Sequence, residues 1–398
     1  MPPSFLSCSP IIGGWGGCSA FYTVSEGSAH AFVVFTESCF MIRAAVMPAP
    51  NTPIEVRAYP EPILEPGGVL LKTLASEVCG TDVHLWHGRL TGVPYPLIPG
   101  HISVGEVLAT NGPVTDINGD LVVPGEAVTF LDVHGTCYNC WQCLVAKQST
   151  RCPHRRVYGI TYGADDGLLG GWSEQIYLKP GVKIIKLIGS VTPELWISGG
   201  CGLPTALHAV ELAQITLGDR VVVQGAGPVG LCVCALAAAS GAAWVGVIDS
   251  VPRRLEAAKK MGADTAILLD ADTVSAVRRA TGGRGADVVI EASGSPQAVP
   301  MGCRLARDGG RYIIVGQYSD NGPAEINPHL DINRKHLTVQ GCWGVDFSHL
   351  WRSMETLSRF RDRFAWTSLI SARYRLEQAG DALAAVEART VVKALIVP

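Results

Sequence analysis

The stretch VVVQGAGPVG, residues 221–230, runs from a strand-forming segment straight into a glycine-rich turn. In a turn of this kind Gly225 permits the sharp bend, Gly227 lets the backbone approach a pyrophosphate, and Gly230 lets the next helix pack closely against the strand. A phosphate held here would face a helix N-terminus, where free N–H groups and the helix dipole favour an anion. The stretch therefore predicts a dinucleotide-binding strand–turn–helix unit.

The residues after this turn support the same prediction. Pro228 and Val229 begin an apolar segment typical of a buried helix, and a second strand at 244–248 leads into Asp249. A carboxylate at that place can bind the hydroxyls of an adenosine ribose. It would repel a 2′-phosphate, so NAD is favoured over NADP as the cofactor. The alternative interpretation is that Asp249 only caps the next helix.

Strand and helix patterns alternate from residue 203 onward. Apolar strand cores recur at 221–223, 244–248, 266–269, 287–290 and 312–315, with helical segments such as 253–260 between them. This order predicts an α/β fold with a doubly wound parallel sheet and right-handed crossovers. We expect the dinucleotide-binding domain to span residues 203–342.

No charged residue lies between Arg220 and Asp249, and hydropathy alone would interpret this run as a membrane span. Glycines and a proline instead divide it into strand, turn, helix, turn and strand. Segments buried within a parallel sheet have this character. We therefore expect interior packing here and no contact with a membrane.

Residues 41–202 have a different character. Short β-runs at 69–74 and 126–130 are bounded by Gly, Pro and Asp, which predicts an irregular β-rich domain with long loops. The apolar run 391–397 predicts a last strand. We expect residues 343–398 to return to this first domain.

The chain has 398 residues, 47% of them hydrophobic and 17% charged, which suits two globular domains. A net charge of −3 offers no basic surface for nucleic acid or a membrane.

Residues 1–40 match no regular pattern and are expected to be a disordered N-terminal extension. They contain no Lys or Arg and so lack the charged start of a signal peptide. Thirteen cysteines in such a chain indicate zinc sites in a reducing compartment, so a cytoplasmic protein is expected.

Cys79, His101 and Cys201, far apart in the sequence, supply two thiolates and an imidazole. Three protein ligands with an open fourth position are typical of a catalytic zinc ion, which acts as a Lewis acid on an alkoxide so that hydride can leave its carbon. Asp82 is the expected hydrogen-bond partner of the ligand histidine. Taken singly, these cysteines and the histidine are equally typical of core residues. Their combination with the dinucleotide loop is what indicates a catalytic zinc site.

Thr81 and His84 closely follow the first of these cysteines. Their hydroxyl and imidazole groups are suited to pass the proton of an alcohol from the metal site to solvent. Alone, His84 is equally typical of a surface loop.

A second cysteine cluster has the spacing of a closed zinc site. Its members are Cys137, Cys140, Cys143 and Cys152. Four thiolates in one loop suit a tetrahedral structural zinc, whose binding can contribute on the order of 10 kcal/mol to folding. The alternative is a set of free or redox-active cysteines.

In this order, the motifs CGTDVH at 79–84, PGH at 99–101, GCG at 200–202 and the loop at 225–230, together with the cysteine cluster, resemble those of the zinc-dependent medium-chain alcohol dehydrogenases. The resemblance extends from Met41 to the C-terminus. It implies a GroES-like catalytic domain beside a Rossmann domain, an active site between them, and a homodimer or homotetramer. It also implies that Thr205 and Val315 lie near the nicotinamide and Arg254 near the adenosine ribose.

Two positions depart from the usual pattern of this family. Ile102 follows the ligand histidine, where the family usually has a Glu that is thought to visit the metal, so ligand exchange is expected to differ. The gap between Cys143 and Cys152 is one residue longer than usual, which bears on whether that site holds zinc. The ligand set also mixes features of two branches of the family, so the substrate stays open.

The combined prediction is a zinc-dependent oxidoreductase that transfers hydride between NAD(H) and a small alcohol or carbonyl substrate. A second interpretation keeps the fold but reduces an activated double bond or imine. A third, from another class, is a non-catalytic zinc-binding interaction protein that uses only the cysteine cluster.

Overall fold

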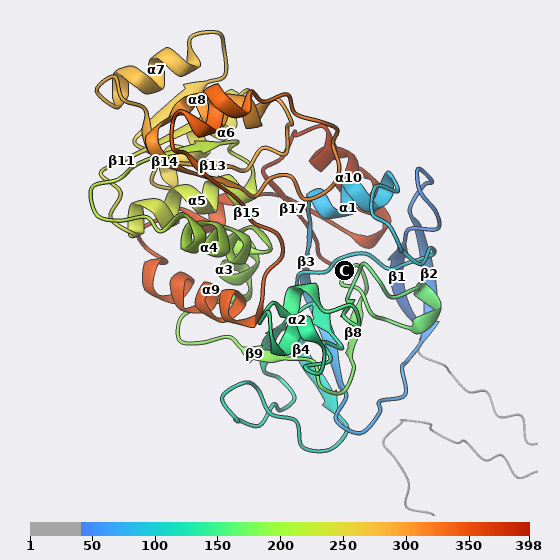
Figure 1. The fold of residues 1–398 in the computed structure, drawn as a ribbon. Coiled ribbons are helices and arrows are strands. Elements are labelled where there is room, and N and C mark those ends of the chain that lie inside the picture. Colours follow the sequence, from blue (N-terminus) through green and yellow to red (C-terminus); the bar gives the residue numbers. More distant parts are fainter. Residues whose placement is uncertain (1–40) are drawn as a thin grey trace, which may run out of the picture.

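The computed structural model describes residues 41–398, and the expected extension at residues 1–40 lies outside this range. The described chain forms two bodies that lie side by side (Figure 1). One is built on a parallel sheet covered by helices, and the other on a mainly antiparallel sheet with long loops.

The parallel sheet has six strands in the order β12-β11-β10-β13-β14-β15. Their bounds are β10 Arg220–Gln224, β11 Trp244–Asp249, β12 Thr265–Leu268, β13 Ala286–Glu291, β14 Ala306–Ile314 and β15 Thr338–Gly341. Every neighbouring pair runs parallel, so the predicted doubly wound α/β fold is confirmed. The strand order reverses between β10 and β13, and such a reversal opens a ligand crevice at the carboxyl ends of the strands.

Alternate residues of β10 face opposite layers of helices, because side chains alternate along a strand. Val221 and Val223 join a core formed with α4 (Gly202–Ala213), α5 (Pro228–Ala239), α6 (Pro252–Lys260) and α9 (Phe347–Phe360). Val222 joins another core with α7 (Thr273–Ala280) and α8 (Ala298–Leu305). Strands that are apolar on both faces need this double cover.

The uncharged run between Arg220 and Asp249 forms β10, α5 and β11, and most of it is buried. Within residues 41–398, no helix combines the length and the apolar character that crossing a membrane requires. The apolar run is therefore interior packing, as the glycine and proline pattern predicted.

The other body contains a seven-stranded sheet in the order β16-β17-β3-β4-β5-β9, with β8 paired to β3. The bounds are β3 Val69–Val78, β4 Ser103–Thr110, β5 Ala127–Phe130, β8 Gln175–Leu178, β9 Ile184–Lys186, β16 Ile370–Tyr374 and β17 Lys393–Ile396. The last strand, β17, pairs antiparallel with β3. The C-terminal segment therefore completes a sheet that begins near the start of the described chain.

Shorter elements surround this sheet. They are β1 Met41–Val46, β2 Glu55–Pro60, β6 Val133–His134, β7 Arg156–Val157, α1 Gly80–Trp86, α2 Trp141–Leu144, α3 Pro193–Gly199 and α10 Ala379–Glu387. Helix α9 packs against α3 and α4, so the segment after residue 343 reaches the seven-stranded sheet only at β16. A single apolar core includes Ile102 and Val104 of one body and Leu203 and Leu231 of the other. This shared core holds the two bodies together beneath the site.

Candidate active site

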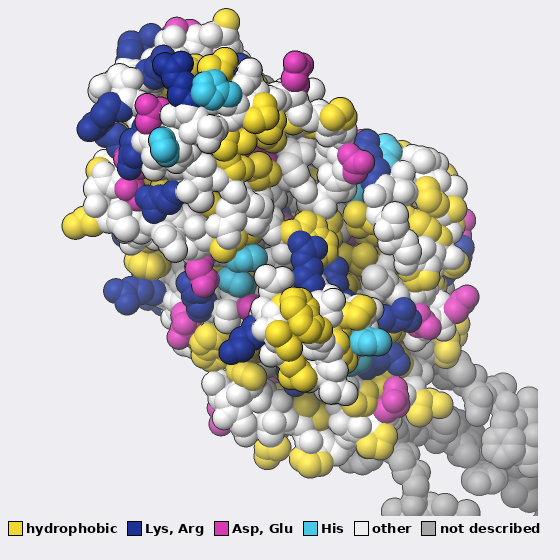
Figure 2. Space-filling model, in the orientation of Figure 1, with side chains coloured by type: hydrophobic (Ala, Val, Ile, Leu, Met, Phe, Trp, Pro, Cys, Tyr) yellow, Lys and Arg dark blue, Asp and Glu magenta, His cyan; other side chains and the backbone are white. Residues whose placement is uncertain are grey.

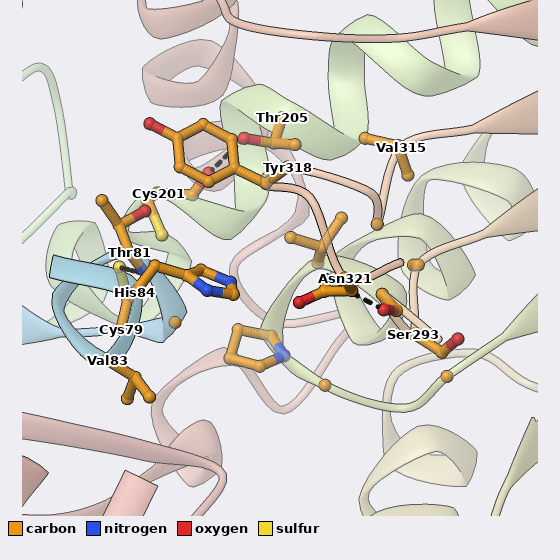
Figure 3. A pocket seen from close by; sticks show the side chains of 18 of the residues that line it. Cys79, Thr81, Val83, His84, Cys201, Thr205, Ser293, Val315, Tyr318 and Asn321 are labelled. Atoms are coloured by element: carbon orange, nitrogen blue, oxygen red, sulfur yellow. Dashed lines mark hydrogen bonds between the residues drawn. The ribbon is translucent and has the colours of Figure 1, made fainter. Parts of the chain in front are cut away.

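A cleft of about 1000 Å³ lies between the two bodies and is lined by most of the predicted site residues. One wall comes from α1 and the loop before β4, and the other from the glycine-rich loop and the loops after β13 and β14. The cleft therefore lies at the crevice created by the strand order of the parallel sheet. Figure 3 shows Cys79, His84 and Cys201 on one side of this space and Val315 and Asn321 on the other.

Cys79, His101 and Cys201 come together in this cleft. Cys79 immediately precedes α1, His101 lies in the loop before β4, and Cys201 immediately precedes α4. Their ligand atoms all lie within 4.8 Å of one another, and Cys79 Sγ is 3.9 Å from His101 Nε2. Tetrahedral zinc with bonds of about 2.3 Å to sulfur and about 2.0 Å to nitrogen would separate such atoms by about 3.5 to 3.8 Å. The donor set and its spacing therefore fit a zinc ion.

Contact between these three side chains shifts the pKa of each of them. A hydrogen bond with the Cys201 thiol, helped by the charge of His101, holds the pKa of Cys79 well below its usual value. Burial alone would lower the pKa of His101, but the Cys79 thiolate raises it to about 10. The site thus holds protons on Cys201 and His101, and a metal that binds there would release them.

Asp82 does not form the expected hydrogen bond with His101. Its Oδ2 accepts the backbone N–H of Cys79 at 2.8 Å and so helps to cap α1. Asp82 Oδ1 and His101 Nδ1 are both buried, and neither has a hydrogen-bond partner among residues 41–398. Burial, together with the charge of Cys79, raises the pKa of Asp82 well above its usual value. In this structure the carboxyl group therefore positions the first cysteine rather than the histidine.

Thr81 and His84 face the same cleft from α1. The backbone N–H of Thr81 donates to Cys79 Sγ at 3.3 Å. His84 Nδ1 lies 3.0 Å from Ser319 Oγ, and burial lowers the pKa of His84, so its imidazole is neutral and can accept a proton near pH 7. Ser319 was not among the predicted site residues. Its place shortly after β14, at the carboxyl edge of the parallel sheet, is the signal that could have found it.

The four cysteines of the second predicted metal site also converge, with all their sulfur atoms within 4.8 Å of one another. The Sγ atoms of Cys140 and Cys143 are 3.5 Å apart, as are those of Cys137 and Cys152. Burial opposes the charged form of Cys152, but backbone N–H groups, that of Cys137 first, lower its pKa to about 6. The longer gap before Cys152 contains a short 3-10 turn at Ser149–Arg151 and does not prevent the convergence. This donor set fits a closed tetrahedral zinc site.

The lobe that carries these cysteines contacts both solvent and the cleft. Figure 2 shows apolar side chains gathered over α2, with Lys and Arg side chains beside them, and the exposed apolar residues of the lobe are Tyr138, Trp141, Leu144 and Val145. On the cleft side, the guanidinium carbons of Arg151 and Arg155 lie 4.7 and 4.9 Å from the centre of the Trp343 ring. Trp343 stacks in turn on Tyr318, and both rings line the cleft. The lobe therefore supports one wall of the site.

The glycine-rich loop has a conformation that requires its glycines. Gly225 has a φ of +96°, and α5 begins at Pro228, directly after Gly227. A side chain at Gly230 would overlap the carbonyl oxygen of Gly225, so helix and loop can approach only because residue 230 is glycine. No atom lies within 4 Å of the place where a Cβ of Gly227 would be. Together with Val229, this open face of the loop borders the cleft.

Asp249 lines the cleft, and both of its carboxylate oxygens accept backbone N–H groups. Oδ2 accepts from Ala226 at 2.6 Å and Oδ1 from Val251, at the start of α6, at 2.8 Å. Each carboxylate oxygen can accept more than one hydrogen bond, so ribose hydroxyls can still bind here. Arg254 borders the cleft as well; burial lowers its pKa, and its Nε has no partner within the described part of the chain.

Thr205 and Val315 line the cleft, as expected from the resemblance. Thr205 Oγ1 donates to the carbonyl oxygen of Cys201 at 2.8 Å. Val315 follows β14 and donates its N–H to the carbonyl oxygen of Glu291 at 2.9 Å. The buried carboxylate of Glu291 accepts two N–H groups of the loop after β13 at 2.7 and 2.8 Å. Glu291 was not predicted, although an acidic residue that ends an apolar strand is a recognisable signal.

Two family models match the chain. A model described as an alcohol dehydrogenase GroES-like domain matches residues 65–188, and one described as a zinc-binding dehydrogenase matches residues 228–360. The first match contains Cys79, His101 and the cysteine cluster. The second begins within the glycine-rich loop.

Whole proteins with known structures or names are also similar. The chain is 34% identical over 369 residues to a 5-exo-hydroxycamphor dehydrogenase of Pseudomonas putida. The aligned region covers 89% of this chain and 98% of that protein. A crystal structure of an alcohol dehydrogenase of Thermotoga maritima matches with a TM-score of 0.85 and 32% identity, covering 90% of this chain and 100% of that one. A protein of Sinorhizobium meliloti 1021, described as a zinc-binding dehydrogenase and bound to NADP, matches with a TM-score of 0.78 and 28% identity, covering 90% and 99%.

Proposed function

Because this chain belongs to the zinc-dependent medium-chain alcohol dehydrogenases, we propose that Cys79, His101 and Cys201 hold its catalytic zinc ion and that the four-cysteine lobe holds a structural one. The protein is a zinc- and nicotinamide-dependent oxidoreductase that acts on alcohols. One observation carries the site assignment: two thiols and an imidazole lie within 4.8 Å of one another in a cleft that also contains the glycine-rich loop.

The residues around the metal have separate tasks in this proposal. A bound zinc ion supplies Lewis-acid stabilisation of negative charge on the substrate oxygen. The Thr81 hydroxyl receives the alcohol proton, and His84, held by Ser319, carries it toward solvent. The glycine-rich loop binds the phosphates of the dinucleotide, while Thr205 and Val315 border the space for the nicotinamide. The substrate carbon and the nicotinamide are thereby held close enough for hydride to pass between them.

We propose NAD rather than NADP as the preferred cofactor. The carboxylate of Asp249 borders the cleft at the end of β11, where a 2′-phosphate would meet its negative charge. The relative from Sinorhizobium meliloti was solved with NADP. Cofactor preference is therefore measured directly, by comparing kcat/KM for the two dinucleotides with one alcohol.

The test of the proposed function is a screen of primary, secondary and polyhydric alcohols in which the formation of NADH is monitored by its absorbance. The zinc content is measured on the same sample. A bulky alcohol is included because the Pseudomonas putida relative is named for hydroxycamphor. In the reverse direction, deuterated cofactor should place deuterium on a carbinol carbon. Deuterium on a carbon atom of a former C=C or C=N double bond would instead identify a reductase of activated double bonds or imines.

We predict that His84 sets the acid limb of the pH profile. Burial lowers the pKa of His84 below its usual 6.5, so the neutral imidazole that accepts the proton persists down to that lower pKa and is lost as the pH falls through it. The measurement is kcat/KM for alcohol oxidation between pH 5 and pH 8, in native protein and in His84→Gln. The variant should lose the acid limb and lose about 100-fold or more in rate at pH 7. An unchanged acid limb in His84→Gln would show that another group controls it.

We predict that Gly227→Ala weakens NADH binding without weakening the fold. A Cβ at this position meets no atom within 4 Å, and Gly227 has a φ of −75°, which alanine adopts freely. The methyl group would instead occupy the space that a pyrophosphate needs. The dissociation constant of NADH should rise about tenfold or more, which corresponds to about 1.4 kcal/mol. The melting temperature should stay close to that of native protein, and Gly380→Ala, a control in α10 with equally open surroundings, should leave NADH binding unchanged.

We further propose a homodimer or homotetramer and a cytoplasmic location. The outer strand β15 exposes all four of its residues and leaves an edge of the parallel sheet unpaired within the described chain, which supports assembly. The ten cysteines in residues 41–398 are all free thiols, which supports a reducing compartment. Light scattering on the purified protein tests the assembly.

We also propose a division of the chain into a catalytic domain at 41–202, a dinucleotide domain at 203–342 and a segment at 343–398 that returns to the catalytic domain.

A further inference from the structure

A buried ion pair joins the first and last strands of the large antiparallel sheet. Lys393 of β17 places its Nζ 2.6 Å from Glu77 Oε1 of β3, and both side chains are 1% exposed. Desolvating two charges costs several kcal/mol each, so apolar residues in place of such a pair often leave stability unchanged or improved. Stability alone is therefore a weak explanation for this pair.

The pair lies directly beneath the turn that presents the third metal ligand. Glu77 Oε2 accepts the backbone N–H of Cys201 at 2.8 Å, and Lys393 Nζ lies 3.4 Å from the carbonyl oxygen of Gly199. Gly200 between them has a φ of +50°, and a side chain there would overlap both Glu77 Oε2 and Lys393 Nζ. The charged pair and the turn 199–201 are thus in close contact.

The two thiol ligands are held in the same way. Asp82 accepts the backbone N–H of Cys79, and Glu77 accepts that of Cys201. Glu77 does not belong to the group of possible ligand atoms around Cys79, and its hydrogen bond to that group is the one it accepts from the Cys201 N–H. Lys393 fixes that carboxylate, because its Nζ occupies the other oxygen.

We propose that Glu77 and Lys393 are a positioning pair that fixes Cys201 for metal binding. This inference rests on the proposed function, since it takes Cys201 to be a zinc ligand. The pair holds the backbone of Cys201 so that its sulfur stays at the distance from Cys79 and His101 that a tetrahedral ion needs. Loss of hydrogen-bond partners that orient metal ligands typically lowers metal affinity 10- to 100-fold.

The test compares two double variants, because either single substitution would leave a buried charge unpaired and impair folding. Glu77→Met/Lys393→Met removes both charges and the acceptor for the Cys201 N–H. Glu77→Gln/Lys393→Met also removes both charges but keeps an amide oxygen as that acceptor. Both should fold, which circular dichroism and the melting temperature will show.

The readout is the rate at which zinc passes to a colorimetric chelator, measured without substrate or dinucleotide. The Met/Met variant should release its three-ligand zinc about 10- to 100-fold faster than native protein. The Gln/Met variant keeps the acceptor for the Cys201 N–H but lacks the Lys393 ammonium that fixes it, so its release rate should lie between the two. Zinc in the four-cysteine lobe serves as the internal reference and should leave all three proteins at the same rate. A folded Met/Met variant that retains zinc as the native protein does would overturn the inference.

The proposed function fails in a different way. If native protein has no zinc whose retention depends on Cys201, the metal assignment is wrong and the positioning role is wrong with it. If Cys201→Ala loses zinc but Met/Met does not, only the positioning role is wrong. Substitution of cobalt for zinc adds a second signature, because the thiolate absorption bands of cobalt should change more in Met/Met than in Gln/Met.

Discussion

Replacing Cys201 with alanine will lower kcat/KM for alcohol oxidation about 10³-fold or more and remove one zinc ion per subunit. The substitution leaves only Cys79 and His101 as ligands, whereas a catalytic zinc needs three. Lewis-acid stabilisation contributes several kcal/mol to the transition state, and each 1.36 kcal/mol is a factor of ten in rate. Steady-state kinetics and metal analysis on the same preparation measure both losses.

Cys232→Ala provides the matched control for this prediction. Cys232 is buried in α5, within the same apolar core as the glycine-rich loop, and belongs to neither group of possible metal ligands. Its substitution should leave zinc content unchanged and activity within a few-fold of native. If Cys201→Ala instead keeps its zinc and its activity, the catalytic site is elsewhere and the proposed mechanism is wrong.

Cys140→Ser will remove the zinc of the four-cysteine lobe and lower the melting temperature by about 5 to 10 °C. Structural zinc binding is worth on the order of 10 kcal/mol in small domains, and a part of that is lost as overall stability here. Each kcal/mol of lost stability lowers the melting temperature by about 2 to 4 °C in a protein of this size class. A loss of a few kcal/mol therefore gives the expected decrease. Calorimetry with zinc analysis is the measurement.

The loss of this zinc should also weaken substrate binding in the cleft. Arg151 and Arg155 of the lobe lie against Trp343, so a loosened lobe should raise KM for the alcohol more than it lowers kcat. Trp141→Ala is the control, because this residue is 64% exposed on the same lobe and is itself a member of neither predicted ligand group. Equal melting temperatures for Cys140→Ser and Trp141→Ala would argue against a structural metal.

The two proposed metal sites differ in how far the sequence could predict them. The cysteine cluster lies within one loop, so its spacing alone indicates a metal site. Cys79, His101 and Cys201 required the order of several motifs, since each residue alone is typical of a protein core. The hydrogen bond expected between Asp82 and His101 is absent: one oxygen of the carboxyl group caps α1, and the other is buried without a partner among residues 41–398. Sequence spacing does not decide whether such a side chain caps its own helix or contacts a distant ligand.

Sequence by itself determined the parallel sheet, the glycine-rich loop and the types of residue in the site. Strand periodicity, turn glycines and cysteine spacing are local properties, and each is encoded within about a dozen residues. Tertiary structure alone decided that Lys393 would meet Glu77 under Cys201, and that Ser319 would meet His84. Those partners come from segments hundreds of residues apart, and their pairing depends on how β17 closes the sheet and how the two bodies meet at the cleft. A lone charge in an apolar strand indicates that a partner is needed, but only packing determines which one.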